Sequence, residues 1–110
     1  MDILFATPQL RDVANDTRLL QRKYSADAAR KIRRRLDDLL AATCLQDLYR
    51  GPGRLHELVG NRRGQLAMEI TGGLRLIFEP ANVPLPLKTD GGLDWSMVTQ
   101  IRILELEDYH

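Results

Sequence analysis

The sequence predicts an α+β domain in which an N-terminal strand and a helical pair pack on one face of a small antiparallel sheet. Two observations carry this prediction. Apolar residues recur at three- and four-residue spacing in the first half of the chain and alternate with polar residues in the second half. Most of the alternating segments are joined by links of hairpin length, which connect antiparallel strands. A length of 110 residues indicates one domain, residues 1–110, with one hydrophobic core.

The first expected elements are a short strand over residues 2–6 and a helical region that follows it. Thr7 supplies an N-cap hydroxyl, and Pro8 stands at the first helical position, where its missing N–H is harmless. The helical spacing continues to residue 24, although Asn15-Asp16 can interrupt it. One helix and two short helices both fit this pattern.

The clearest helix is expected over residues 25–42. Ser25 is its N-cap candidate, and Asp27 favours the dipole of the first turn. Its buried stripe consists of Ala29, Ile32, Leu36, Leu39 and Leu40. Five basic residues lie largely off this stripe, namely Arg30, Lys31, Arg33, Arg34 and Arg35. Two of them have an aspartate four residues further on, an ion-pair spacing that weakens the case for a nucleic-acid-binding helix.

The second half of the chain predicts a sheet. After a short helical turn at residues 45–49 and a Gly51-Pro52-Gly53 breaker, strands are expected at residues 54–58, 65–70, 74–79 and 98–105. A tight hairpin is expected at residues 71–73, where two glycines accept positive φ angles. In the last strand, the set Thr99, Ile101, Ile103 and Glu105 is the more apolar one and is expected to face the helices. Residues 80–96 form a long irregular segment, which Trp95 is expected to anchor.

The composition excludes several classes of protein. Apolar residues make up 44% and charged residues 28%, which excludes a disordered tail, and no apolar run approaches the roughly 20 residues that cross a bilayer. No secretion signal is expected, and a single cysteine fits a reducing compartment, so we expect a cytoplasmic protein. Residues 1–63 carry thirteen basic and eight acidic residues, whereas residues 64–110 carry three and seven. Such a basic half fits both a polyanion ligand and a solvated helix surface.

The motifs of common cofactor and metal enzymes are absent from the sequence. It holds no GxxxxGK[ST] loop, no GxGxxG loop, no HExxH pair and no GxSxG turn. No cofactor is therefore expected. His56 and His110 are the only histidines, too few for an ordinary zinc site, so no metal is expected either.

The remaining polar residues suit cleavage of RNA without a metal ion. Attack by the 2′-OH requires a base, an acid for the leaving 5′-oxygen and cations for the charge that develops on the phosphorane. The catalytic candidates are His56, Arg75, Asp108, Tyr109 and His110, and the RNA-binding candidates are Arg54, Arg62 and Arg63. Each has a structural alternative, such as a salt bridge for Arg75 or a polar tail for the last three residues. These residues alone leave the function open.

Three segments of the sequence resemble the HigB-type killer-protein branch of the RelE/ParE toxins. They are residues 53–64, 74–82 and 107–110, and their order, their spacing and the C-terminal ending all agree with that family. The resemblance implies a RelE-like toxin of a type II toxin-antitoxin pair, which cuts mRNA in the ribosomal A site without a metal ion. It also implies a partner, commonly a helix-turn-helix antitoxin, and a toxin-antitoxin hetero-oligomer.

The resemblance also implies roles for individual residues. Arg75 would hold the scissile phosphate, and His110 or Asp108 would handle proton transfer at the 2′-OH. Tyr109 would stack on the nucleotide or orient it, and His56 would be the second proton-transfer group.

Two positions depart from the family pattern and keep other functions open. Val59 stands where many HigB toxins have a lysine, and Glu69 stands where some have a strand arginine, so cationic support for the transition state is thinner. The alternatives are a ParE-like toxin that acts on DNA gyrase and a catalytically weak toxin homologue that serves as the antitoxin's co-repressor.

Overall fold

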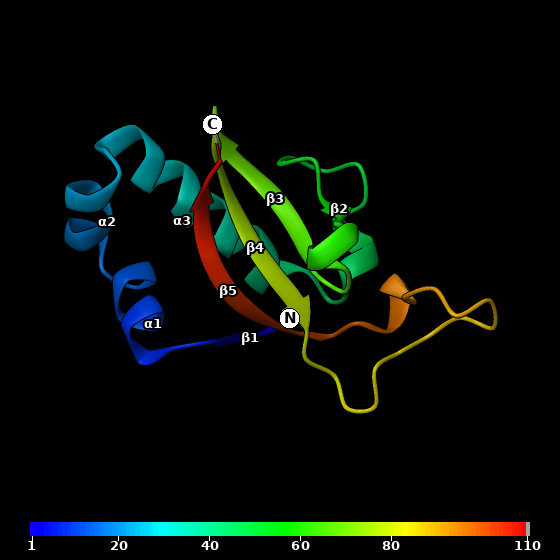
Figure 1. The fold of residues 1–110 in the computed structure, drawn as a ribbon. Helices are drawn as coiled ribbons and strands as arrows, with labels where there is room; N and C mark the ends of the chain where they lie inside the picture. Colours follow the sequence, from blue (N-terminus) through cyan, green and yellow to red (C-terminus); the bar gives the residue numbers. More distant parts are fainter. Residues whose placement is uncertain (110) are drawn as a thin grey trace.

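The structure, a computed structural model, describes residues 1–109 and shows the α+β fold that the sequence predicts (Figure 1). Its α-helices are α1 (Pro8–Ala14), α2 (Thr17–Lys23) and α3 (Ala26–Ala41). Its strands are β1 (Asp2–Phe5), β2 (His56–Glu57), β3 (Leu66–Thr71), β4 (Leu74–Pro80) and β5 (Gln100–Asp108). Three short 3-10 helices are η1 (Leu45–Leu48), η2 (Gly60–Arg62) and η3 (Trp95–Met97). Within these residues, no helix has the length and apolar character needed to span a bilayer.

The five strands form one sheet in the order β1-β5-β4-β3-β2. Strands β2 to β5 pair antiparallel, as expected, whereas β1 pairs parallel with β5. The sheet is therefore mixed rather than purely antiparallel. The parallel pair arises because the chain leaves β1 into the helices, forms the other strands and returns beside β1 only in β5 (Figure 1).

Side-chain caps set the starts of the three helices. Thr7 caps α1, Asp16 caps α2 and Ser25 caps α3, and each side-chain oxygen accepts a backbone N–H of the first turn. The cap at Asp16 explains why the region before residue 24 forms two short helices instead of one. Thr7 and Ser25 act as the sequence predicts.

The core lies between α3 and one face of the sheet. Ile32, Leu36 and Leu39 of α3 pack in one cluster with alternate residues of the central strands, such as Leu76 and Phe78. Side chains of successive strand residues point to opposite faces, so the residues between these apolar positions belong to the other face of the sheet. Figure 1 shows α3 behind the sheet, with the other face turned outward. We call that other face the open face.

A bulge in β5 changes which residues reach the open face. Phe78 pairs with Ile103, but the next residue back along β4, Ile77, pairs with Glu105, so Leu104 is an extra residue. Ile101 and Ile103 are buried toward the helices, as expected. The expectation that Glu105 shares their side is wrong, because the bulge shifts the alternation and puts Glu105 on the open face.

The long segment between β4 and β5 is anchored through Trp95, as the sequence predicts. The indole N–H of Trp95 donates to a carboxylate oxygen of Glu57 at 3.1 Å, and its ring meets Tyr49 edge-on with centroids 6.2 Å apart. The segment leaves the body of the molecule beyond the end of β4 (Figure 1).

Gly53 lies where the chain crosses the edge of β3. Its φ is +92°, a conformation that L side chains rarely adopt, and its carbonyl accepts the N–H of Glu69 at 2.6 Å. A Cβ on this residue would lie 3.2 Å from Cδ of Arg35 and 3.3 Å from the carbonyl oxygen of Glu69. The position therefore requires glycine for two reasons, backbone conformation and space.

We expect Gly53→Ala to lower the free energy of unfolding by about 2 kcal/mol, measured by urea denaturation. Gly64→Ala is the matched control, because Gly64 has the same φ of +92° but nothing within 4 Å of its Cβ position. It should cost only about 1 kcal/mol, the backbone part alone. Equal losses in the two variants would show that crowding at Gly53 contributes nothing.

Candidate functional site

Arg75 lies on β4 in the middle of the open face. Its cross-strand partners are Glu107 on β5 and Glu69 on β3. The guanidinium donates from Nε to Oε1 of Glu107 at 2.8 Å, and Nη2 lies 2.7 Å from the same oxygen. The Arg75 and Glu107 side chains are only 19% and 20% exposed. Arg75 is thus held by a close ion pair, which is the structural alternative considered from the sequence.

Tyr109 covers the flat side of the Arg75 guanidinium. Its ring centroid lies 4.5 Å from the guanidinium carbon, a cation–π contact. The backbone N–H of Tyr109 donates to the carbonyl of Gly73 at 2.7 Å, which fixes this part of the chain against the β3–β4 turn. The tyrosine remains 47% exposed. An exposed ring beside a guanidinium can stack on a base while the cation contacts a phosphate.

Arg62 reaches the same face from the short helix η2. Its guanidinium pairs with Glu105 and Glu107 and donates from Nη1 to Oε1 of Gln65 at 2.9 Å. Arg62 and Arg75 therefore share Glu107, and the two guanidiniums are balanced by two carboxylates. A phosphate that binds here has to compete with these carboxylates, which weakens the attraction of this face for RNA.

The network shifts the pKa values of Glu107 and Arg62. Burial disfavours the charged form of Glu107, but the hydrogen bond and charge of Arg75, together with those of Arg62, outweigh it and lower the pKa of Glu107. The hydrogen bond with Glu105, opposed by burial and aided by the two carboxylate charges, raises the pKa of Arg62. Both shifts favour the charged forms of Glu107 and Arg62.

The lowered pKa of Glu107 predicts a loss of stability in acid. The unfolded chain takes up this proton near the ordinary value of 4.5, and the folded chain does so at lower pH. The network's contribution is therefore complete above that ordinary value and is lost as the pH falls through the folded pKa. We expect the melting temperature of the wild type, followed by circular dichroism, to fall more steeply below about pH 4.5 than that of Glu107→Gln. Parallel curves for the two proteins would contradict this assignment.

His56 lies on the same face, in the edge strand β2. It pairs with Ala67 of β3, which pairs with Ile77 of β4, two residues from Arg75. Nδ1 of His56 lies 2.7 Å from the carbonyl oxygen of Arg54, so this nitrogen carries the donated proton. Nε2 is then an acceptor in the neutral ring, the state that a general base requires.

Asp108 lies on the other side of the sheet from Arg75. It pairs with Leu74, whose side chain belongs to the core beneath the helices. Burial, together with the charge of Asp108, raises the pKa of Tyr24, which places this carboxylate near α2. His110 lies outside the described residues.

The other predicted cations differ in their partners. The guanidinium of Arg54, 77% exposed, lies 3.3 Å from a carboxylate oxygen of Glu69. Arg63 is exposed just after η2 and has no ion pair within residues 1–109. Val59 is 85% exposed nearby and adds no charge. The structure thus brings His56 and Arg75 to one face, with Tyr109 over Arg75, and leaves Arg63 on the surrounding turn.

Sequence reasoning gave no role to Glu105 or to Glu107 as a side chain. Glu105 was expected on the helix side, and the partner of Arg75 depends on the register between β4 and β5. The only signal is indirect, a carboxylate at every second position near the end of the chain. Among residues 1–109, no three His, Cys, Asp or Glu side chains lie together in a way that could hold a metal ion.

Comparison with solved structures shows that the fold is that of the YoeB/ParE-type toxins. The chain is similar to the YoeB/ParE toxin from Agrobacterium tumefaciens, with a TM-score of 0.62, 13% identity and complete coverage of both chains. It is also similar to a chain of the YoeB-YefM complex from Staphylococcus aureus (TM-score 0.56, 17% identity) and to the YoeB dimer from the same organism (0.55, 19%). Both alignments cover all of this chain and 97% of the other.

Sequence comparisons add no closer assignment, since no protein-family model and no curated protein matches the chain. The RelE-like fold expected from the sequence is confirmed. The HigB branch stays a prediction.

Proposed function

We propose that the protein is the toxin of a type II toxin-antitoxin pair and that it cleaves mRNA in the ribosomal A site. The observation that carries this proposal is the stack of Tyr109 on Arg75, on the open face of a fold shared with YoeB and ParE toxins. The stack puts a cation and an exposed ring side by side, as binding of a phosphodiester and its base requires. Assignment to the HigB-type branch rests on the sequence resemblance of residues 53–64, 74–82 and 107–110.

In this proposal the RNA supplies its own nucleophile, the 2′-OH. Arg75 holds the scissile phosphate and stabilises the charge that develops on it. Tyr109 stacks on the nucleotide, and His56 accepts the 2′-OH proton at Nε2 as that oxygen attacks the phosphorus. His110 is the second proton-transfer group and donates a proton to the 5′-oxygen that leaves. The pairing of Asp108 with Leu74 on the helix side supports leaving Asp108 out of the reaction.

An antitoxin partner is the second part of the proposal. Similar structures include the YoeB-YefM complex and a heterotetrameric YoeB-YefM toxin-antitoxin complex. We infer that this chain is neutralised in a comparable hetero-oligomer, with a helix-turn-helix antitoxin as the sequence resemblance implies. Action on translating ribosomes would take place in the cytoplasm.

A ParE-like toxin that acts on DNA gyrase is the second candidate. The pairing of Arg62 and Arg75 with Glu105 and Glu107 favours it, because little unbalanced positive charge is left on the open face for RNA. A gyrase-directed toxin would need no residues for RNA cleavage.

The test is induced expression in growing bacteria, alone and together with the neighbouring open reading frame. The proposal predicts growth arrest, truncated mRNAs and rescue by the neighbouring protein. Growth arrest with intact mRNA and altered plasmid supercoiling would contradict mRNA cleavage and support a ParE-like toxin that acts on DNA gyrase. Normal growth would contradict toxin activity and favour the co-repressor role.

A further inference from the structure

A basic cleft adjoins the Arg75 site at the end of the sheet. It has a volume of about 350 Å³ and lies between α3 and the β3–β4 turn. This volume is within the range of about 300 to 1,000 Å³ that is usual for ligand sites. Its charged and aromatic lining consists of Lys31, Arg34, Arg35, Arg54, Glu69 and Tyr109. We call it the α3 cleft.

Counted over residues 1–109, the lining of the α3 cleft is positive, with four cations and one carboxylate. Arg35 is 9% exposed and is held by Asp38, with Nη1 and Oδ2 3.0 Å apart. Lys31 lies 3.3 Å from Asp27. Both aspartates are on α3 outside the lining of the cleft, so the cleft stays positive even when they are counted.

Arg34 is the free cation of this group. It is exposed, and within the described part of the chain it has no ion pair. This contrasts with Arg62 and Arg75 on the open face, each of which is balanced by a carboxylate. A polyanion that reaches this end of the molecule therefore meets an unbalanced cation in the cleft, whereas Arg75 is paired with Glu107.

Tyr109 connects the two places. Its ring stacks on Arg75, and the same residue lines the cleft. A nucleotide stacked on Tyr109 would have its own phosphate near Arg75 and a neighbouring phosphate near the cleft. The chain of contacts is continuous from one site to the other.

We propose that the α3 cleft binds a backbone phosphate of the RNA strand, next to the nucleotide that stacks on Tyr109, and that Arg34 is its main contact. This inference rests on the proposed function, because it takes RNA as the ligand. The cleft supplies the attraction that the charge-balanced open face lacks. Arg75 is then free to act on the scissile phosphate after the strand is held.

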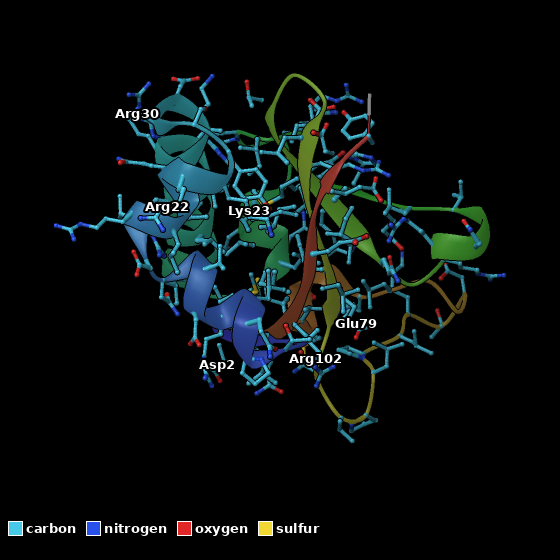
Figure 2. The ribbon with its side chains drawn as sticks, turned by 60° about the vertical axis from the view of Figure 1, so that its left-hand side comes forward. Asp2, Arg22, Lys23, Arg30, Glu79 and Arg102 are labelled. Carbon is cyan, nitrogen blue, oxygen red and sulfur yellow. The ribbon has the colours of Figure 1, made fainter. Side chains whose placement is uncertain are left out.

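The experiment measures binding of a fluorescent single-stranded RNA whose 2′-hydroxyls are methylated to prevent cleavage, by anisotropy over a series of salt concentrations. We expect Arg34→Ala to weaken binding about five- to tenfold and to reduce the slope of log affinity against log salt by about 0.7, the value for one lost phosphate contact. Alanine favours helix at this exposed position, so the variant should stay folded. Arg22→Ala is the matched control, since it removes an exposed, unpaired arginine from α2, on the helical side of the molecule (Figure 2).

The outcomes separate this inference from the proposed function. Equal loss in Arg34→Ala and Arg22→Ala would indicate general electrostatic attraction and would overturn the cleft as a site, while RNA binding itself stands. Unchanged binding in Arg34→Ala would also overturn it and would leave the cleft to an acidic protein partner. A wild-type protein that does not bind the RNA at all, in the presence or absence of ribosomes, would overturn the inference and the proposed function together.

Discussion

Replacing Arg75 with alanine is expected to reduce the cleavage of translated mRNA by at least about 100-fold. Among the described ring contacts, Arg75 is the only arginine that contacts Tyr109. Its removal takes away both the phosphate contact and the guanidinium on which the Tyr109 ring stacks. Arg75→Lys should restore only part of the rate, because an ammonium cannot present two parallel donors to a phosphate. Single-turnover rates in a translating extract measure the effect.

Arg102→Ala is the control for this prediction. Arg102 is also an arginine paired with a carboxylate on the open face, with Nη1 3.4 Å from Oε1 of Glu79. Figure 2 shows Arg102 and Glu79 side by side, at the end of the sheet away from the β3–β4 turn. The Arg102→Ala variant should cleave mRNA at the wild-type rate. If Arg75→Ala also keeps the wild-type rate, Arg75 has only a structural role.

Glu107→Gln is expected to strengthen RNA binding about tenfold at low salt. The substitution removes the negative charge that Arg62 and Arg75 share, so the open face gains one unbalanced positive charge. The dependence of affinity on salt should become steeper by about 0.7 in the logarithmic slope. Anisotropy with the methylated RNA measures both quantities.

Glu79→Gln serves as the comparison, because it removes a carboxylate from the same face beside Arg102 instead of Arg75. Its effect on RNA binding should be small. If Glu107→Gln binds RNA no better than the wild type, competition between the Glu107 carboxylate and phosphate does not limit the affinity of the open face for RNA.

Much of the fold follows from local signals in the sequence. The apolar stripe and Ser25 predict α3, and glycines predict the β3–β4 turn, because a helix cap and a tight turn depend on neighbouring residues. The parallel pairing of β1 with β5 has no such signal. It joins segments about 98 residues apart, as in the pair Ile3 and Ile101, and it depends on the packing of the whole chain.

The candidate site, like the fold, could be predicted from the sequence only in part. Arg75, Tyr109 and His56 are identified from the sequence, since residue type and the resemblance point to them. The carboxylates that balance Arg62 and Arg75 are not, because a one-residue bulge at Leu104 decides which face Glu105 occupies. The same network explains how a chain with strand arginines can have a nearly neutral open face.

Ribosome-dependent cleavage is tested by mapping mRNA 5′ ends after the wild-type protein acts on one reporter mRNA, either translated or with initiation blocked. We predict cuts at in-frame positions in the translated mRNA and little cleavage of the untranslated one, because the ribosome has to position a substrate that the charge-balanced face binds weakly. Intact mRNA in both samples, or equal cleavage in both, would contradict ribosome-dependent cleavage by this protein.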